Sequence, residues 1–272
     1  MEITVFNVEQ YSKVTDKFLE HHGIAEIKPD FSGLNQVLHA FRSIPYENVS
    51  KLIKYGRGYG NGEVEIRLPD TIWQEYQGFG LGGTCYSLTF FLEAILTNTG
   101  FMCYSVSADM KWGKDVHCGL VVMLDGMHWW CDPGYLLMTP LQLSGRKQQV
   151  YRTDSSGVIL EYDGIKYSLI TFNGRQKKRR YTFKDRVCNR EEFLRYWLRS
   201  FERPGMNGIC LTRQERDGMI YIHNNYFREV NRSGIKKKRM DGNWFKQIEK
   251  AFGIPERLLE EAHNFAWQRR KK

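Results

Sequence analysis

The sequence of 272 residues lacks any uninterrupted apolar run that approaches the roughly 18 residues of a membrane-spanning helix. Its N-terminal stretch, "MEITVFNVEQYSKV", lacks the basic start and the apolar centre of a secretory signal. Internal repeats and low-complexity linkers are also missing. We therefore expect a globular, cytoplasmic chain with no membrane partner.

Cysteine is infrequent, and no two cysteines have the CxxC spacing that is typical of structural zinc sites. His128 and Cys131 stand three residues apart in a predicted strand, where such positions point to opposite faces. The sequence therefore predicts no metal site. In a reducing compartment, the cysteines of a chain this long are typical of buried thiols with at most one reactive group, and they do not indicate disulfides. They are Cys85, Cys103, Cys118, Cys131, Cys188 and Cys210.

Negative charge is the scarcer sign, because 31 Asp and Glu residues stand against 40 Lys and Arg residues and give a formal net charge of +9. Three basic clusters, at 175–180, 236–239 and 269–272, contribute much of this excess. Such clusters bind nucleic acid, membrane surfaces or anionic small molecules, or they form a solvated face. No cluster is interleaved with the aromatic residues of a single-strand binding groove, so we do not expect nucleic acid as a partner.

Apolar periodicity predicts helices first, then strands, then a mixed third part. Helices are expected at 11–23 and 31–43, and the Gly-rich residues 55–70 are expected to form a loop with one short strand. Strands are expected at 101–109, 116–124 and 127–132, followed by a hairpin at 157–172. The third part is expected to hold a helix at 190–201, two or three strands within 209–230, and helices at 243–253 and 255–270.

The stretch "GFGLGGTCYSLTFFL" places a cysteine at the start of an apolar helix. Thr84 is a good N-cap residue, so Cys85 takes the first helical position. The backbone N–H groups there have no helical partners, and the helix dipole favours negative charge. This environment lowers the pKa of a thiol, so Cys85 is a candidate nucleophile.

A two-residue hairpin turn is predicted at "DG" (125–126), between two of the middle strands. That register places Gly119 directly opposite Asp132, and His117 becomes the diagonal neighbour of the aspartate on the same face of the sheet. Diagonal neighbours are close enough for a hydrogen bond between imidazole and carboxylate. Gly119, which has no side chain, is expected to leave room for the carboxylate to lean toward the ring.

Cys85, His117 and Asp132 together form the set that a cysteine nucleophile requires. The imidazole takes the thiol proton, and the carboxylate orients and supports the imidazolium. The alternative interpretation of each residue alone is structural: a buried thiol, a hydrogen-bonded core histidine and a turn-forming aspartate. The conjunction of the three favours catalysis.

Several motifs resemble those of the arylamine N-acetyltransferases. "LGGTC" keeps the glycines and cysteine of the family's R-G-G-x-C, and "FFLEAILTNTGF" is similar to the helix that follows it. "VHCGLVV" matches the histidine motif, "CDPGY" followed by "TPLQL" resembles D-x-G-F, and "SIPYENVSKL" resembles P-F-E-N-L. "FLEHHGI" stands where the family has a helix ending near R-I-G, and "FGIPERL" is a weaker match near the C-terminus. The resemblance spans most of the chain to about residue 150.

The resemblance implies an α+β fold with a cysteine-protease or transglutaminase-like core. The expected parts are a helical domain (1–83), a β-barrel-like domain with the nucleophile helix (84–189) and an α/β lid domain (190–272). It also implies that Cys85, His117 and Asp132 transfer an acetyl group from acetyl-CoA to an arylamine, hydrazine or N-hydroxyarylamine by a ping-pong mechanism, with no metal.

On this resemblance Tyr135, Tyr46 and Thr84 are the candidate contacts to the amine substrate, and Lys114 is the candidate contact to CoA. The alternative interpretation of either tyrosine is a core residue, and the alternative interpretation of Lys114 is a solvated loop residue. We expect a monomer or a homodimer, a small-molecule amine and CoA as partners, and no nucleic acid.

The chain departs from the family pattern at several places. Leu81 replaces the arginine of the nucleophile motif, so the charge partner of that arginine is expected to be absent. Pro133 and Tyr135 replace an aliphatic residue and a phenylalanine near the aspartate. Because of these departures, the sequence says less about the acceptor substrate than about the acyl-transfer chemistry. The alternatives are a related thiol acyltransferase or amide synthase, a transglutaminase-like hydrolase, or a basic binding protein with a vestigial triad.

Overall fold

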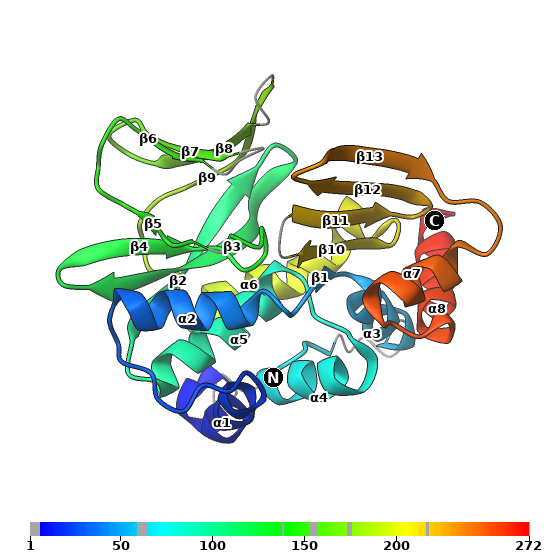
Figure 1. Ribbon diagram of the computed structural model, residues 1–272, viewed down its shortest axis with the longest axis horizontal. Coiled ribbons are helices and arrows are strands. Elements are labelled where there is room, and N and C mark those ends of the chain that lie inside the picture. Colours follow the sequence, from blue (N-terminus) through cyan, green and yellow to red (C-terminus); the bar gives the residue numbers. More distant parts are fainter. Residues whose placement is uncertain are drawn as a thin grey trace.

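The computed structural model describes residues 6–58, 65–137, 139–152, 157–172, 176–215 and 218–271. Its first part is helical, as the apolar periodicity predicted (Figure 1). After a short 3-10 helix η2 (Val8–Tyr11), the helices are α1 (Ser12–His21), α2 (Phe31–Phe41), α3 (Val49–Gly58), α4 (Pro69–Phe79) and α5 (Cys85–Asn98).

Helices α1 and α2 begin and end where the sequence indicates. α1 is followed by Gly23, whose φ of 66° lies in the left-handed region that glycine adopts without strain. α2 begins after Asp30, whose carboxylate accepts a 2.8 Å hydrogen bond from the backbone N–H of Gly33. Their apolar faces pack with η2, α4 and α5 into one core.

The expectation of a loop with one short strand at 55–70 was wrong within the described residues, and 59–64 lie outside them. α3 extends to residue 58, residues 65–68 form no strand, and α4 begins at Pro69. Glycine content masked the helical spacing of apolar residues in α3. Leu52 and Ile53 are buried there against the C-terminal helix α8 (Glu256–Arg270), so tertiary burial outweighs local propensity.

Among the described residues, eight antiparallel strands form a sheet that curls into a half barrel (Figure 1). The strands run in the order β5-β4-β3-β2-β9-β8-β7-β6. Their bounds are β2 (Met102–Met110), β3 (Gly113–Leu124), β4 (Met127–Cys131), β5 (Leu141–Gln142), β6 (Gln148–Arg152), β7 (Gly157–Tyr162), β8 (Tyr167–Phe172) and β9 (Lys177–Phe183).

The predicted register of the β3–β4 hairpin is confirmed. Asp125 and Gly126 form the turn with φ values of 50° and 73°, the left-handed geometry of a two-residue hairpin. Leu124 then pairs with Met127, and Leu120 pairs with Cys131. The next residues outward are Gly119 and Asp132.

A second sheet of five described strands, in the order β1-β10-β11-β12-β13, draws its first strand from the N-terminal part. β1 (Tyr46–Glu47) pairs with β10 (Cys210–Glu215), and the side chain of Asn48 accepts a 2.7 Å hydrogen bond from the backbone N–H of Cys210. The hairpins continue through β11 (Gly218–His223), β12 (Tyr226–Asn231) and β13 (Gly234–Arg239), the last of which was not predicted.

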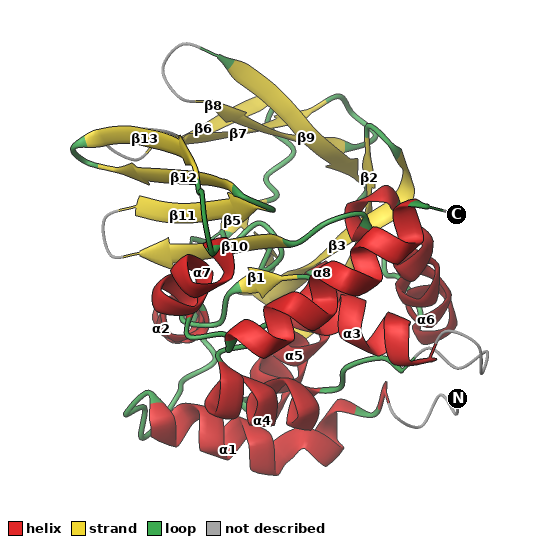
Figure 2. Ribbon diagram, turned by 90° about the vertical axis from the view of Figure 1, so that its right-hand side faces the viewer, coloured by secondary structure: helices red, strands yellow, loops and turns green. Residues whose placement is uncertain are grey.

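The remaining helices are α6 (Arg190–Arg199), α7 (Trp244–Phe252) and α8 (Glu256–Arg270), with 3-10 turns at Ser200–Glu202 and Pro204–Met206. Figure 2 shows most of the helices gathered at one end of the molecule and the strands at the other. α5 lies between them and packs on α1, α4, β2 and β3. The first residue of this buried helix therefore lies at the junction of helices and sheet.

Candidate active site

Cys85 is the first residue of α5, as the sequence predicted. Thr84 has the extended backbone of an N-cap residue, with φ of −95° and ψ of 176°, but its side chain makes no capping hydrogen bond. The backbone N–H groups of the first helical turn therefore lack the side-chain acceptor that an N-cap threonine normally supplies. They remain donors for a negative charge near the thiol.

The two glycines before the nucleophile allow the chain to pass close to the segment at Pro45. A Cβ atom on Gly82 would lie 1.8 Å from the carbonyl oxygen of Pro45, so no side chain fits there. The N–H of Gly83 donates to the same carbonyl at 3.2 Å, and Glu47 N–H donates to the carbonyl of Gly83 at 2.9 Å. The turn that carries Cys85 is thereby fixed to β1.

An arginine that the sequence analysis missed, Arg67 from the segment before α4, lies at the turn that follows Leu81. Leu81 itself is buried in the apolar core. The Arg67 guanidinium, only 4% exposed, donates to the carbonyl oxygen of Gly82 and forms ion pairs with Glu47 at 3.3 Å and Glu75 at 2.6 Å. An arginine therefore holds the nucleophile turn, although it lies elsewhere in the sequence.

The predicted pair between His117 and Asp132 is present. His117 Nε2 lies 2.8 Å from Asp132 Oδ2, and the two residues are 3% and 0% exposed. Burial lowers the pKa of the imidazole, but the Asp132 carboxylate and the Cys85 sulfur outweigh burial and raise the pKa of His117 to about 10. The histidine is therefore a cation at neutral pH.

Gly119 does not make room for the carboxylate, which corrects the sequence-based expectation. A Cβ atom there would lie 2.6 Å from the Trp130 ring and 2.8 Å from the carbonyl oxygen of Cys131. The glycine therefore admits the indole of Trp130, which packs over the β3 backbone. Other donors fix the carboxylate of Asp132.

Asp132 accepts two further hydrogen bonds that the sequence analysis missed. The hydroxyl of Tyr181 donates to Oδ2, and the backbone N–H of Tyr135 donates to Oδ1 at 2.9 Å. Trp130 Nε1 donates in turn to the Tyr181 oxygen at 3.0 Å. Tyr181 lies on β9, whose pairing with the distant strand β2 left no local signal in the sequence.

The Cys85 thiol is 8% exposed and lies among groups that favour its ionised form. The thiol of Cys118, His117 and Lys51 together lower the pKa of Cys85 well below its usual value, although burial opposes them. Cys118 was interpreted as a structural thiol, and burial raises its own pKa, so it remains protonated as a donor toward Cys85. The sequence contained no local signal for this, because residues 117 and 118 of one strand point to opposite faces of the sheet.

Gly134 lies directly against Cys85 and His117. A Cβ atom on this glycine would lie 2.8 Å from Cys85 Cβ and 3.0 Å from His117 Cε1. Both side chains therefore lie about 3 Å from one point, which places them next to each other. The glycine belongs to the "CDPGY" stretch, so the pattern contained this signal.

Two of the candidate substrate contacts lie beside the thiol. The Tyr135 ring is 5.3 Å from the His117 ring, and burial raises the pKa of Tyr135 to about 12. Tyr46 is close to Cys85 and Tyr135, and burial raises its pKa well above the usual value. Lys114, in contrast, is exposed near the β2–β3 turn and contacts none of these groups in any described hydrogen bond or ion pair.

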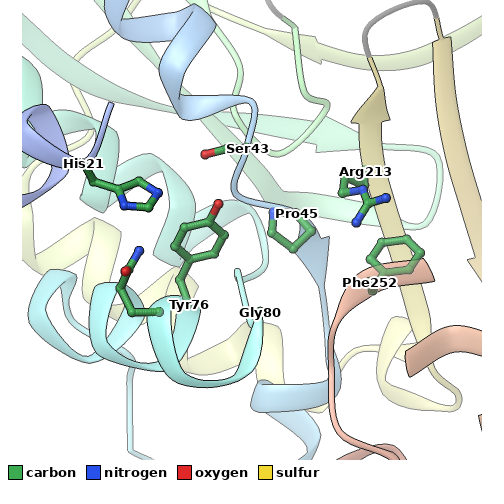
Figure 3. A pocket seen from close by; sticks show the side chains of 8 residues that line it. His21, Ser43, Pro45, Tyr76, Gly80, Arg213 and Phe252 are labelled. Carbon is green, nitrogen blue, oxygen red and sulfur yellow. The ribbon is translucent and has the colours of Figure 1, made fainter. Parts of the chain in front are cut away.

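A pocket of about 310 Å³ lies near this site but contains none of Cys85, His117 and Asp132. It touches the nucleophile turn through Pro45 and Gly80, and Figure 3 shows Arg213 and Phe252 on the far side from Tyr76. Its lining consists of His21, Ser43, Pro45, Tyr76, Gln77, Gly80, Arg213 and Phe252.

Within the described ranges, no three His, Cys, Asp or Glu side chains gather as metal ligands, and no helix is long and apolar enough to cross a membrane.

The arrangement is suited to nucleophilic acyl chemistry. A thiol of lowered pKa at a helix start lies beside a histidine of raised pKa, and a buried carboxylate with three donors holds that ring. Backbone N–H groups at the same helix start are oriented for a developing oxyanion.

Comparison with known proteins agrees with this chemistry. A family model described as N-acetyltransferase matches residues 30–257. No curated protein sequence matches the chain. Among solved structures, the arylamine N-acetyltransferase from Mycobacterium abscessus is 18% identical, with a TM-score of 0.77 over 91% of this chain and 93% of that one.

Two further structures have a similar fold. The arylamine N-acetyltransferase from Salmonella typhimurium is 18% identical, with a TM-score of 0.75 over 92% of this chain and 97% of that one. The enzyme from Mycobacterium marinum, solved in complex with CoA, is 16% identical, with a TM-score of 0.76 over 91% of this chain and 98% of that one.

Proposed function

Because the chain belongs to the N-acetyltransferase family, we propose that it moves an acetyl group from acetyl-CoA, through a thioester on Cys85, to an arylamine, hydrazine or N-hydroxyarylamine. The observation that carries the proposal is the thiol at the start of α5 beside the buried His117–Asp132 pair. The fold shared with arylamine N-acetyltransferases supports the acceptor class, and the CoA-bound relative supports the donor.

In the first half-reaction the Cys85 thiolate attacks the carbonyl carbon of the acetyl thioester. Negative charge develops on the carbonyl oxygen, which the N–H groups at the start of α5 stabilise. The bond between that carbon and the CoA sulfur then breaks. The His117 imidazolium gives its proton to the departing sulfur, and acetyl-Cys85 and CoA result.

In the second half-reaction an amine attacks the carbonyl carbon of acetyl-Cys85. Neutral His117 takes a proton from the amine nitrogen, and the carbon–sulfur bond breaks to regenerate the Cys85 thiolate. Asp132 stabilises the imidazolium that forms. Since both half-reactions use one thiol, the kinetics are ping-pong.

The substrate contacts are part of the same proposal. Tyr135 and Tyr46 offer aromatic faces to a flat acceptor, and Thr84 lines the start of the helix. Lys114 is assigned to the CoA phosphates on its charge alone. Pro133 and Tyr135, where the chain departs from the family motif, set the shape of this acceptor region.

The organisation of the molecule is proposed in three parts, at 1–83, 84–189 and 190–272, around a cysteine-protease-like core. We also propose a cytoplasmic location and a monomer or homodimer. The curled sheet and the mixed α+β fold support the proposed division into three parts.

Intact-mass measurement after brief exposure to acetyl-CoA tests the chemistry. The wild type should gain one acetyl group, Cys85→Ala should gain none, and an added arylamine should remove the group as acetylated amine. Absence of an acetylated wild type contradicts the donor half of the proposal. An acetyl group lost to water at the same rate with and without amine contradicts the acceptor half.

A further inference from the structure

The ionised site carries an unbalanced charge. The Cys85 thiolate and the Asp132 carboxylate are negative and the His117 imidazolium is positive, so the three sum to one negative charge. These residues are 8%, 0% and 3% exposed. A buried net charge is costly unless an opposite charge lies close to it.

A buried cation that the mechanism does not use lies at the same helix start. Lys51 on α3 is 7% exposed and shares a cavity of about 10 Å³, room for one water molecule, with Thr84 and Ser87 of the first turn of α5. Its Nζ donates to the hydroxyl of Ser200 at 2.5 Å and lies 4.5 Å from the centre of the Phe201 ring. A hydroxyl and an aromatic face orient an ammonium but do not neutralise it.

The carboxylates around Lys51 are paired with other cations. Glu65 pairs with Lys54 at 2.5 Å. Glu47 and Glu75 share the one cation of Arg67, and burial raises the pKa of Glu47, which favours the neutral form of that carboxyl group. Within the part of the chain that the structure describes, no carboxylate lies within ion-pair distance of Lys51.

Two other titratable groups face Lys51. Arg269 of α8 donates to the carbonyl oxygen of Phe201 at 2.9 Å and repels the ammonium. Cys118 on β3 stays protonated, because burial raises its pKa. Cys85 is therefore the acid that remains to balance Lys51.

We propose that Lys51 is a positioning residue whose ammonium group is the counter-ion of the ionised Cys85. The assignment deepens the proposed function, since it explains how a buried site holds its thiolate ready for acetyl-CoA. Acetylation removes the thiolate charge, so Lys51 holds its proton less tightly in the acetyl-enzyme than in the free enzyme.

The electrostatics of the two groups are reciprocal. Burial lowers the pKa of Lys51 to about 8, and the Cys85 thiolate acts against that decrease. Lys51 in turn lowers the pKa of Cys85. The ammonium is present below pH 8 and is lost as the pH rises through that value, so its effect on the thiol is greatest on the acid side.

The first test measures the rate of Cys85 alkylation by iodoacetamide between pH 4 and pH 10. Lys51→Met should move the midpoint upward and slow alkylation on the acid limb about tenfold, which corresponds to about one pKa unit. Lys51→Arg keeps the charge and should restore most of the rate. Arg57→Met, on the same helix but outside the cavity that Lys51 lines, is the matched control and should follow the wild type. A folded Lys51→Met protein with the wild-type profile would overturn the proposal.

A second test leaves Lys51 in place and so does not depend on how Lys51→Met folds. The protonation of Lys51 is followed by NMR of 13C- and 15N-labelled lysine in the wild type and in Cys85→Ser, with the signal assigned from Lys51→Arg. The pKa of Lys51 should be lower in Cys85→Ser, because the thiolate is gone. An unchanged pKa would overturn the proposal. Both tests read ionisation and not turnover, so a failure of acetyl transfer to arylamines is a separate result.

Discussion

The two sides of Cys85 are built differently. On the sheet side, β3, the end of β4 and β9 bring together His117, Asp132 and Tyr181, which are joined by hydrogen bonds that move or hold protons. On the helical side, α3 and the segment before α4 bring Lys51 and Arg67, which supply positive charge and no base. In the proposed mechanism the sheet side performs proton transfer, whereas the helical side fixes the turn and balances the charge. Substitutions on the two sides should therefore affect reaction rate and stability differently.

The largest effect is expected from breaking the sheet side with Asp132→Asn. The amide no longer stabilises the imidazolium and favours the wrong tautomer of His117, so kcat/KM for acetyl transfer should fall by about 10⁴-fold. Steady-state assay of CoA release measures this. Thermal unfolding serves as the control, and a loss of activity that only follows loss of fold would contradict the assigned role.

On the helical side, Arg67→Met should act on stability before it acts on chemistry. The substitution leaves the carboxylate of Glu47, which is 0% exposed, without its cation, and breaking such a buried pair costs about 3–5 kcal/mol. Urea unfolding measures the change. The matched control is Arg57→Met, whose side chain is 63% exposed and pairs with Glu261, so its loss should stay below about 1 kcal/mol. Equal losses in both variants would refute the buried role of Arg67.

Gly134→Ala should disturb the contact between Cys85 and His117, where the sheet side meets the nucleophile. The added methyl group would lie 2.8 Å from Cys85 Cβ and 3.0 Å from His117 Cε1, so it should push the thiol and the ring apart. A displacement of about 1 Å costs about 10²-fold in rate, and we expect kcat to fall by that order. Gly78→Ala, where nothing lies within 4 Å of the new Cβ, is the control. Wild-type kcat in Gly134→Ala would contradict the geometry.

A smaller effect is expected from Tyr181→Phe. This variant removes one donor to Asp132 and leaves Trp130 Nε1 without its acceptor, while His117 and the backbone N–H of Tyr135 still bind the carboxylate. The rate of acetyl transfer should fall about tenfold, in keeping with the loss of one hydrogen bond to a charged group. The steady-state assay of CoA release measures this as well, and a loss as large as that of Asp132→Asn would mean that Tyr181 has a larger role.

The pH dependence of the wild type sharpens the comparison without a substitution. Protonation of the departing CoA sulfur needs the His117 imidazolium, whose pKa is about 10, so acetyl transfer should decline only as the pH rises through about 10. Alkylation of Cys85 needs the thiolate alone and should not decline there. Parallel profiles of the two reactions are the measurement, and a shared alkaline decline would contradict the assignment of His117.

The sheet side was largely predictable because its central contact is local. A two-residue turn fixes the β3–β4 register, and the register alone brings His117 diagonal to Asp132. The helix start at Cys85 was predictable for the same reason, since the N-cap and the apolar run are adjacent in the sequence. The catalytic roles of these residues remain predictions until they are tested.

The helical side was not predictable, because its residues meet only in the folded chain. Arg67 approaches Gly82 across α4, and Lys51 reaches α5 from a helix that glycine-rich composition hid. Tyr181 was missed in the same way, since its strand pairs with a strand from a distant part of the sequence. Charged residues in such segments look like solvated surface until their burial is known.

The pairing of β1 with β10 has a consequence for synthesis on the ribosome. Pro45 and Glu47 hold the nucleophile turn, and their own strand rests on residues that are translated more than a hundred positions later. A nascent chain that stops before residue 210 already contains the cysteine, the histidine and the aspartate. It lacks the strand with which β1 pairs, so the turn that carries Cys85 is fixed in place only near the end of translation.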